Sequence, residues 1–202
     1  MSSKKGKNSS LMRLTKDVKR MKKFFKKPEV KFEITALNTT SDNAGAFYPL
    51  MQQVASGTAH DQRIGNSVDL LSINLRIMNR LADAGYNNVR YAIIKCRNPP
   101  PTAVELFETT SYATFGGVYA EWDRDLVEKV YLDKNITLNQ QISGANVSKF
   151  GKHFIKMPMT LHYNDVNPGS LNEHILLVLT SDSVLAPHPG VNAVVKCNFV
   201  DV

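Results

Sequence analysis

Apolar and polar residues alternate along most of the chain after residue 30, with the period of two that is typical of β-strands. In residues 30–37, VKFEITAL, the apolar side chains Val30, Phe32, Ile34 and Ala36 share one face. Similar segments occupy residues 47–54, 68–80, 87–97, 126–138, 152–163, 172–182 and 191–200. The pattern therefore predicts eight strands.

Segments rich in turn-forming residues separate these strands, namely SDNAG, ADAG, NPPP, VNPG and APHPG. ADAG at residues 82–85 predicts a hairpin between the strands on either side of it. The strongest helix signal here is PTAVELFETT, where Thr102 and Glu105 form a capping box behind Pro101. Many strands with one short helix predict an all-β fold, an antiparallel double-sheet sandwich of jelly-roll or Greek-key type.

Residues 9–27 have a different period, because their apolar positions recur every three or four residues. Leu11, Leu14, Val18, Met21 and Phe25 form this stripe, and Pro28 ends it. The segment is predicted to be a basic amphipathic helix whose narrow stripe resembles a coiled-coil seam. The basic residues of this region are the candidate nucleic-acid-binding residues: Lys4, Lys5, Lys7, Arg13, Lys16, Lys19, Arg20, Lys22, Lys23, Lys26 and Lys27.

The net charge of +7 is distributed unevenly along the 202 residues. Residues 1–31 contain 12 basic and two acidic residues, a balance of +10, whereas residues 32–202 have a balance of −3. We therefore divide the chain into a basic arm at 1–31, helical or partly disordered, and a sandwich domain at 32–202. An apolar content of 43% is enough for a single core in a domain of this size.

Four interpretations of the arm remain open from its sequence. Clustered lysines favour salt-sensitive, sequence-independent binding to nucleic-acid phosphates. The same pattern fits a helix on an acidic membrane surface, although no apolar run of about 18 residues predicts a membrane span. The segments KKGK and KRMKKFFKK also fit a nuclear-import signal. A solvated, disordered tail without a binding role is the fourth interpretation.

Motifs that carry chemistry are missing from the sequence. The five histidines form no close-spaced ligand pair, and no nucleotide-binding or nucleophile-elbow motif occurs. We therefore expect no enzymatic activity, catalytic residue, cofactor, metal site or small-molecule substrate. Glu121, Asp123 and Asp125 in EWDRD offer oxygen ligands suited to calcium, but a solvated loop around Trp122 fits the segment better.

Residues 61–76, DQRIGNSVDLLSINLR, resemble the segment before the second long strand of a family of small viral capsid proteins. The family includes those of satellite tobacco necrosis virus and of circular single-stranded DNA viruses with related shells. Its motif at this place is Asn-Gln-Arg-x-Gly. Here Asp61 replaces the first residue, while Gln62, Arg63 and Gly65 match. The resemblance continues in VRYAIIKCRNPPPTAVELFETT, VYLDKNITLN, MTLHYN and HILLVLTSDS, and it includes the basic arm.

The resemblance implies an eight-stranded jelly roll that assembles with itself into a T=1, 60-subunit icosahedral shell with the arms inside on the genome. It favours single-stranded DNA over RNA as the genome. It implies a location in the virion and, during assembly, inside the host cell and its nucleus. Such shells hold calcium between subunits, but no residue of this chain matches those ligands. The alternative class is a non-viral, sequence-independent nucleic-acid-binding β-sandwich module.

The matched residues Gln62 and Arg63 are candidate anchors of the loop before the strand at 68–80, or of a subunit contact. An ordinary exposed position at the strand entrance is the alternative for Arg63. In the resembled family arrangement, the strands that carry Cys96 and Cys197 would be neighbours in one sheet. We expect both thiols to be reduced, because two cysteines are too few for a disulfide framework.

Overall fold

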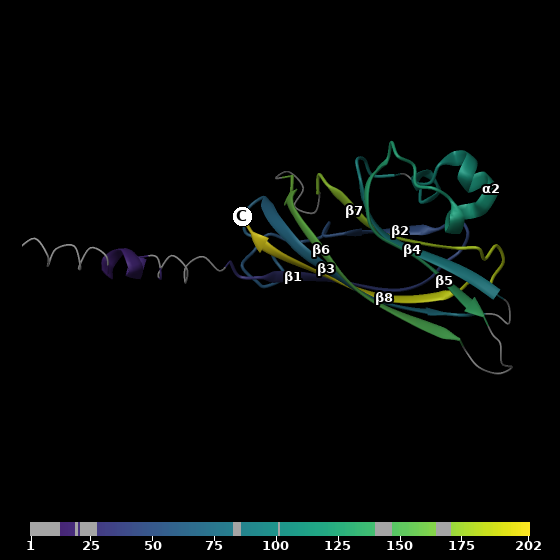
Figure 1. The fold of residues 1–202 in the computed structure, drawn as a ribbon, viewed down its shortest axis with the longest axis horizontal. Coiled ribbons are helices and arrows are strands. Elements are labelled where there is room, and N and C mark those ends of the chain that lie inside the picture. Colours follow the sequence, from purple (N-terminus) through teal and green to yellow (C-terminus); the bar gives the residue numbers. More distant parts are fainter. Residues whose placement is uncertain are drawn as a thin grey trace, which may run out of the picture. The chain divides into compact units, whose positions relative to one another are not determined.

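The computed structural model describes residues 13–18, 20, 28–82, 86–100, 102–139, 147–164 and 171–202. The chain divides into two units, Met1–Val30 and Lys31–Val202. The second unit contains all eight predicted strands (Figure 1). They are β1 (Lys31–Thr40), β2 (Ala46–Leu50), β3 (Ser67–Arg80), β4 (Tyr86–Cys96), β5 (Val127–Asn139), β6 (Ser148–His162), β7 (His174–Ser181) and β8 (Gly190–Asp201).

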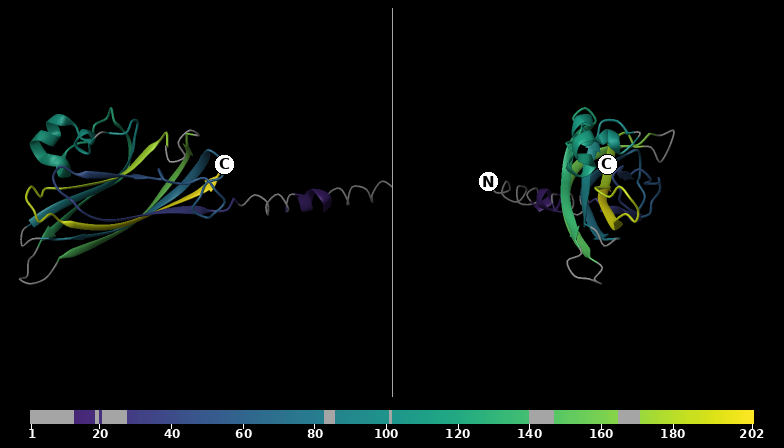
Figure 2. Two further views of the ribbon diagram at one scale, coloured as in Figure 1. Left: turned by 180° about the vertical axis from the view of Figure 1, so that it is seen from behind. Right: turned by 90° about the vertical axis from the view of Figure 1, so that its right-hand side faces the viewer.

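The strands form two antiparallel four-stranded sheets, which confirms the all-β sandwich (Figure 2). Sheet A has the order β1-β8-β3-β6, and sheet B has the order β2-β7-β4-β5. The first strand pairs with the last, β2 pairs with β7, β3 with β6 and β4 with β5. This nested pairing results when a long two-stranded ribbon is rolled into two layers.

The hairpin predicted between the third and fourth strands is wrong. β3 lies in sheet A between β8 and β6, whereas β4 lies in sheet B between β7 and β5. The chain therefore passes from one sheet to the other between Arg80 and Tyr86, and residues 83–85 lie outside the described residues. Turn residues alone do not distinguish a hairpin from such a crossing, because both need a reversal of the chain.

The main core lies between the two sheets, and a β-bulge in β3 changes which residues face it. Val68 and Leu70 are buried in this core before the bulge, and Ile73, Leu75 and Ile77 are buried after it. The register of β3 with both neighbouring strands shifts between Leu70 and Ser72. Because of the bulge, the even-numbered residues of β3 face the core before it and the odd-numbered residues face the core after it.

A second apolar layer covers the outer face of sheet B. The 3-10 helix η1 (Val104–Leu106) and the helix α2 (Thr109–Tyr119) lie over this sheet (Figure 1). Leu106 and Phe107 pack with Ile94 and Val178 in this layer, while Ile93 faces the main core. The strands β4 and β7 are therefore buried on both faces along most of their length.

The capping box predicted at Thr102 does not begin the long helix. Thr102 contacts Glu105 through their side chains, but the short η1 has no side-chain cap. The helix α2 begins at Thr109 instead, because the Glu108 carboxylate accepts the first free backbone N–H groups of that helix. A capping box identifies a helix start only when the residues after it are packed as a helix.

The two cysteines are not neighbours in one sheet, contrary to the arrangement that the family resemblance implied. Cys96 is on β4 in sheet B and belongs to the layer under η1 and α2, whereas Cys197 is on β8 in sheet A and faces the main core. Both are free and buried. Burial raises the pKa of the Cys96 thiol to about 11 and raises the pKa of the Cys197 thiol as well.

We expect neither a disulfide nor rapid alkylation of the native protein at pH 8. A raised pKa leaves few thiolates, and the two thiols lie in different layers. Mass spectrometry without reductant should give the mass with both thiols intact. Iodoacetamide should modify both cysteines in urea and neither in buffer. A mass lower by two hydrogens would contradict this expectation.

Candidate nucleic-acid arm and loop anchor

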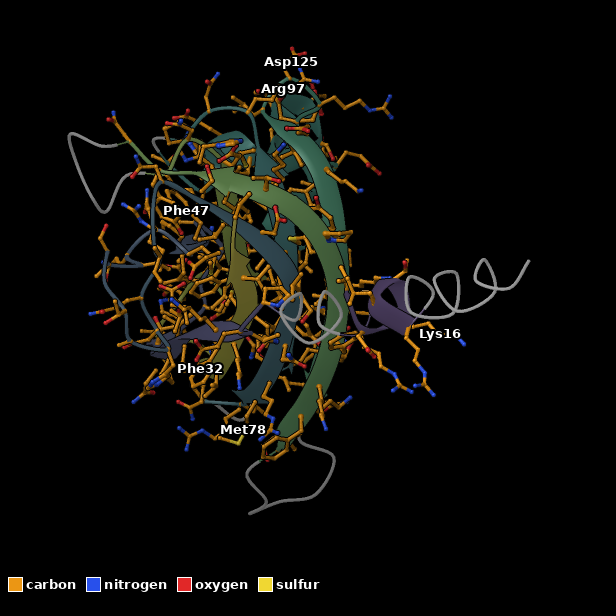
Figure 3. All side chains as sticks on the ribbon, turned by 90° about the vertical axis from the view of Figure 1, so that its left-hand side faces the viewer. Lys16, Phe32, Phe47, Met78, Arg97 and Asp125 are labelled. Atoms are coloured by element: carbon orange, nitrogen blue, oxygen red, sulfur yellow. The ribbon has the colours of Figure 1, made fainter. Side chains whose placement is uncertain are left out.

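The basic arm is described at residues 13–18 and 20, which are helical and exposed. Arg13, Lys16 and Arg20 have the spacing of one helical face, while Leu14 and Val18 lie on another. Figure 3 labels Lys16, whose side chain extends from this helix. The remaining candidates lie outside the described residues: Lys4, Lys5, Lys7, Lys19, Lys22, Lys23, Lys26 and Lys27.

Lys31 belongs to the sandwich, although the sequence analysis placed it in the arm. Its side chain is almost fully buried, and Nζ lies 2.7 Å from Oδ2 of Asp201 on β8. The same Nζ donates a hydrogen bond of 2.9 Å to the backbone oxygen of Gln62. Burial of a lysine requires such partners. Residues 1–30 therefore carry 11 basic and two acidic residues, a balance of +9.

Arg63 is buried within the sandwich domain, in the loop between β2 and β3. Only 1% of its surface is exposed, so the exposed position considered from the sequence does not apply. Nη1 donates to the backbone oxygen of Gly65 and to Oδ1 of Asn66. The guanidinium lies 4.3 Å from the ring centroid of Tyr163, whose hydroxyl donates to the backbone oxygen of Met51. Arg63 thus joins both ends of one loop.

The side chain of Gln62 folds back onto the backbone of the same loop. Its Oε1 accepts the backbone N–H of Ala59 at 3.1 Å. A Cβ atom at Gly57 would lie only 1.9 Å from this oxygen, so a larger residue at Gly57 would displace the amide. Gly65 has φ of +81°, in the left-handed region that favours glycine. The three matched motif positions therefore contribute to one folded loop.

Arg63→Ala is expected to lower the free energy of unfolding by about 1 to 3 kcal/mol, because it removes a buried side chain together with its hydrogen bonds to Gly65 and Asn66 and its contact with the Tyr163 ring. Thermal and urea unfolding of the full chain would measure this loss. Arg124→Ala removes an exposed arginine and provides the matched control, with an expected change within about 0.5 kcal/mol. Equal stability of the two variants would show that the Arg63 contacts contribute nothing measurable.

Arg90 forms a second buried cluster, under α2, that the sequence analysis did not identify. Nε and Nη2 donate to the two carboxylate oxygens of Asp133 on β5, at 2.9 and 2.6 Å. Nη1 donates to the backbone oxygens of Gly117 and Ala120, at 3.0 and 2.6 Å. The guanidinium also lies 4.4 Å from the ring centroid of Trp122. In the sequence, an arginine next to the apolar residues of β4 was the feature that could have indicated a buried cation.

The acidic segment EWDRD uses its side chains to form a turn. Oδ1 of Asp123 accepts the backbone N–H groups of Asp125 and Leu126, at 2.7 and 3.1 Å. Trp122 stacks on Phe107 with ring centroids 4.9 Å apart, and its Nε1 donates to Asp133. Within the described ranges, no three His, Cys, Asp or Glu side chains are grouped so that they would hold a metal ion.

Two further observations bear on the function. Among the described residues, no helix is both long enough and apolar enough to cross a membrane. Comparison of the chain with protein-family models and with curated proteins gives no match.

Proposed function

We propose that the chain is a viral capsid protein, a jelly-roll subunit that assembles into a T=1, 60-subunit shell and binds the genome through its basic arm. The nested pairing of strands, β1 with β8 through β4 with β5, carries this proposal. Eight strands in two such sheets are characteristic of jelly rolls, and capsid domains are prominent among them. The resemblance of residues 61–76 supports the same class.

The separation of charge supports the role of the arm. Residues 1–30 have a balance of +9, while residues 31–202 have 14 basic and 16 acidic residues, a balance of −2. The positive charge is therefore concentrated in the arm, which is the part of the chain proposed to bind the nucleic-acid phosphates. The resemblance favours single-stranded DNA, since phosphate contacts by themselves do not distinguish DNA from RNA.

Exposed apolar side chains in the loops support self-assembly. Ile64, Val184 and Leu185 are 55%, 68% and 80% exposed. Water contact with such side chains is unfavourable, and identical copies of the chain would bury them in repeated subunit contacts. This proposal includes no catalytic role and no assigned cofactor or calcium ligand. It places the protein in the virion and, through the basic runs KKGK and KRMKKFFKK, in the host nucleus during assembly.

Electron microscopy of the purified full chain, combined with size-exclusion chromatography and light scattering, tests the proposal. We expect uniform icosahedral particles of about 1.3 MDa, compared with 22.5 kDa for one chain. Assembly should be examined with and without added single-stranded DNA. If the protein binds DNA but stays a monomer or small oligomer under every condition, the alternative, a non-viral nucleic-acid-binding module, is supported.

A further inference from the structure

The outer face of sheet A is open in the described structure, in contrast to that of sheet B. The helices η1 and α2 pack on sheet B. On sheet A, the outward residues Phe150, Phe154 and Ile34 are 79%, 69% and 54% exposed. The strand register places Phe32 and Met78, both labelled in Figure 3, on the same face. Large exposed apolar groups that lie together usually mark a binding surface.

The strand β6 presents an alternating row of aromatic and basic side chains on this face. Its outward residues are Phe150, Lys152, Phe154 and Lys156, all exposed, whereas Ile155 between them is buried. Successive outward residues are about 6.6 Å apart along a strand, so a cation lies between and beside the two rings. The strand is at the edge of sheet A, with β3 on one side only.

The neighbouring strands extend the positive charge across the sheet. Arg76 and Arg80 on β3 lie opposite Lys152 and Ser148, and Asn74 lies between Lys196 and Phe154. Between the row of Phe32 and that of Arg80, the register places five cations and no carboxylate on this face of the described strands. The three ion pairs found among the described residues involve other cations.

A shallow depression crosses the middle of this face. Ile34, Arg76, Lys152, Val194 and Lys196 are among the residues that line it. Nζ of Lys196 lies 4.0 Å from the ring centroid of Phe32, so cation and ring are already adjacent at the other side of the sheet. The outer face of sheet A thus combines exposed aromatic rings, neighbouring cations and a depression that lies among them.

We infer that this outer face of sheet A binds single-stranded nucleic acid, with Phe150 and Phe154 stacked on bases and Lys152, Lys156 and Arg76 on phosphates. The inference rests on the proposed function and adds that the partner must have accessible bases. Aromatic platforms beside basic side chains bind single strands in this way, with little preference for sequence. The bases of a duplex are already stacked on each other and would not reach these rings.

A second copy of the chain fits this face less well. An isologous contact would bring the five cations of one copy against the same five cations of another, without a carboxylate to separate them. A polyanion with aromatic bases matches both the charge and the rings. Association between copies through this face is therefore the outcome that would count against the inference.

Binding of two probes by the full chain separates the sheet face from the arm. One probe is a 20-nucleotide oligothymidylate, and the other is an abasic oligomer of the same length and phosphate number. The arm binds phosphates and should not distinguish them. Stacking on even one ring should make the protein bind the oligothymidylate about tenfold more tightly or better. The difference should persist at high salt, where binding through phosphates weakens.

The double variant Phe150→Ala, Phe154→Ala should lose this preference and keep the salt dependence of the full chain. Tyr86→Ala, Tyr119→Ala removes two exposed aromatic side chains that are not on sheet A and should keep the preference. Phe150→Leu, Phe154→Leu keeps apolar side chains without rings and should behave like the alanine variant. Melting temperatures of all variants would show that each is folded, as expected for exposed positions.

Each alternative outcome has a distinct meaning. Equal binding of both probes by the natural sequence would overturn the sheet-face inference and leave the arm as the genome-binding element. No binding of either probe would reject the proposed genome function itself. An unchanged base preference in the double variants, together with failure to form particles, would overturn the inference and assign the face to contacts between subunits.

Discussion

Deletion of residues 1–30 is expected to lower the affinity for single-stranded nucleic acid by several orders of magnitude at low salt and to leave the sandwich folded. The deleted unit contains 11 of the 25 Lys and Arg residues, and all eight strands lie after it. Each phosphate neutralised on a single strand contributes about −0.7 to the slope of log affinity against log salt. The intact protein should therefore show a steep slope and the truncated protein a shallow one.

In an assembled shell, the same deletion should remove most of the packaged nucleic acid. Sixty arms with a balance of +9 each would bring about 540 positive charges to the interior, enough for a substantial part of a genome of roughly a thousand nucleotides. The ratio of absorbance at 260 and 280 nm would report the load of the particles. Replacement of Lys22, Lys23, Lys26 and Lys27 by Gln keeps the arm length and provides an intermediate control.

Retention of the full load by truncated particles would show that the arm is not the packaging element, and the membrane-surface interpretation of the helix would gain weight. Weak residual binding has a different meaning. If the remaining affinity depends on bases and little on salt, it belongs to the outer face of sheet A. The deletion and the Phe150 and Phe154 variants therefore test separate contributions to one activity.

Arg90→Ala is expected to destabilise the sandwich by about 3 to 5 kcal/mol, the largest effect of a single substitution that we predict. The change leaves the carboxylate of Asp133 without its bidentate partner and two carbonyl oxygens at the end of α2 without a donor. It also removes the group that lies over Trp122. We expect α2 to detach from sheet B before or together with global unfolding.

Urea unfolding followed by the fluorescence of Trp122, the single tryptophan, would measure this effect directly. Arg90→Met keeps much of the packed stem, so a smaller loss is expected and would separate packing from charge. A double-mutant cycle with Asp133→Asn gives the coupling between the two side chains. A loss below about 1 kcal/mol for Arg90→Ala would mean that the cluster is not needed to hold α2.

The alternation of single strands could be predicted from the sequence, because each strand has one face toward the main core. All eight strands are found within a few residues of their predicted bounds. The connections could not be predicted in the same way. A hairpin and a crossing between sheets use the same turn residues, so β3 and β4 were paired wrongly. The start of α2 was also misplaced, since the Glu108 cap was not recognised.

The arm candidates follow from charge alone, and the loop motif follows from the family resemblance, but the buried environment of Arg63 does not. Its burial depends on Tyr163, which comes from a distant part of the sequence. The open face of sheet A could not be predicted from the sequence either. Alternation shows that Lys152 and Phe154 share a face of the strand predicted at residues 152–163, yet it does not say which sheet η1 and α2 will cover. That choice is made by packing between distant segments.

The pairing of β1 with β8 brings the beginning and the end of the sandwich together. Lys31 lies beside Phe199 in this pair and forms an ion pair with Asp201, so the sandwich begins next to its last strand. A short linker from Val202 to Lys31 would close the domain into a ring without altering any strand. Opening that ring between β7 and β8 would give a circular permutant, in which the basic segment is attached at the opposite end of sheet A.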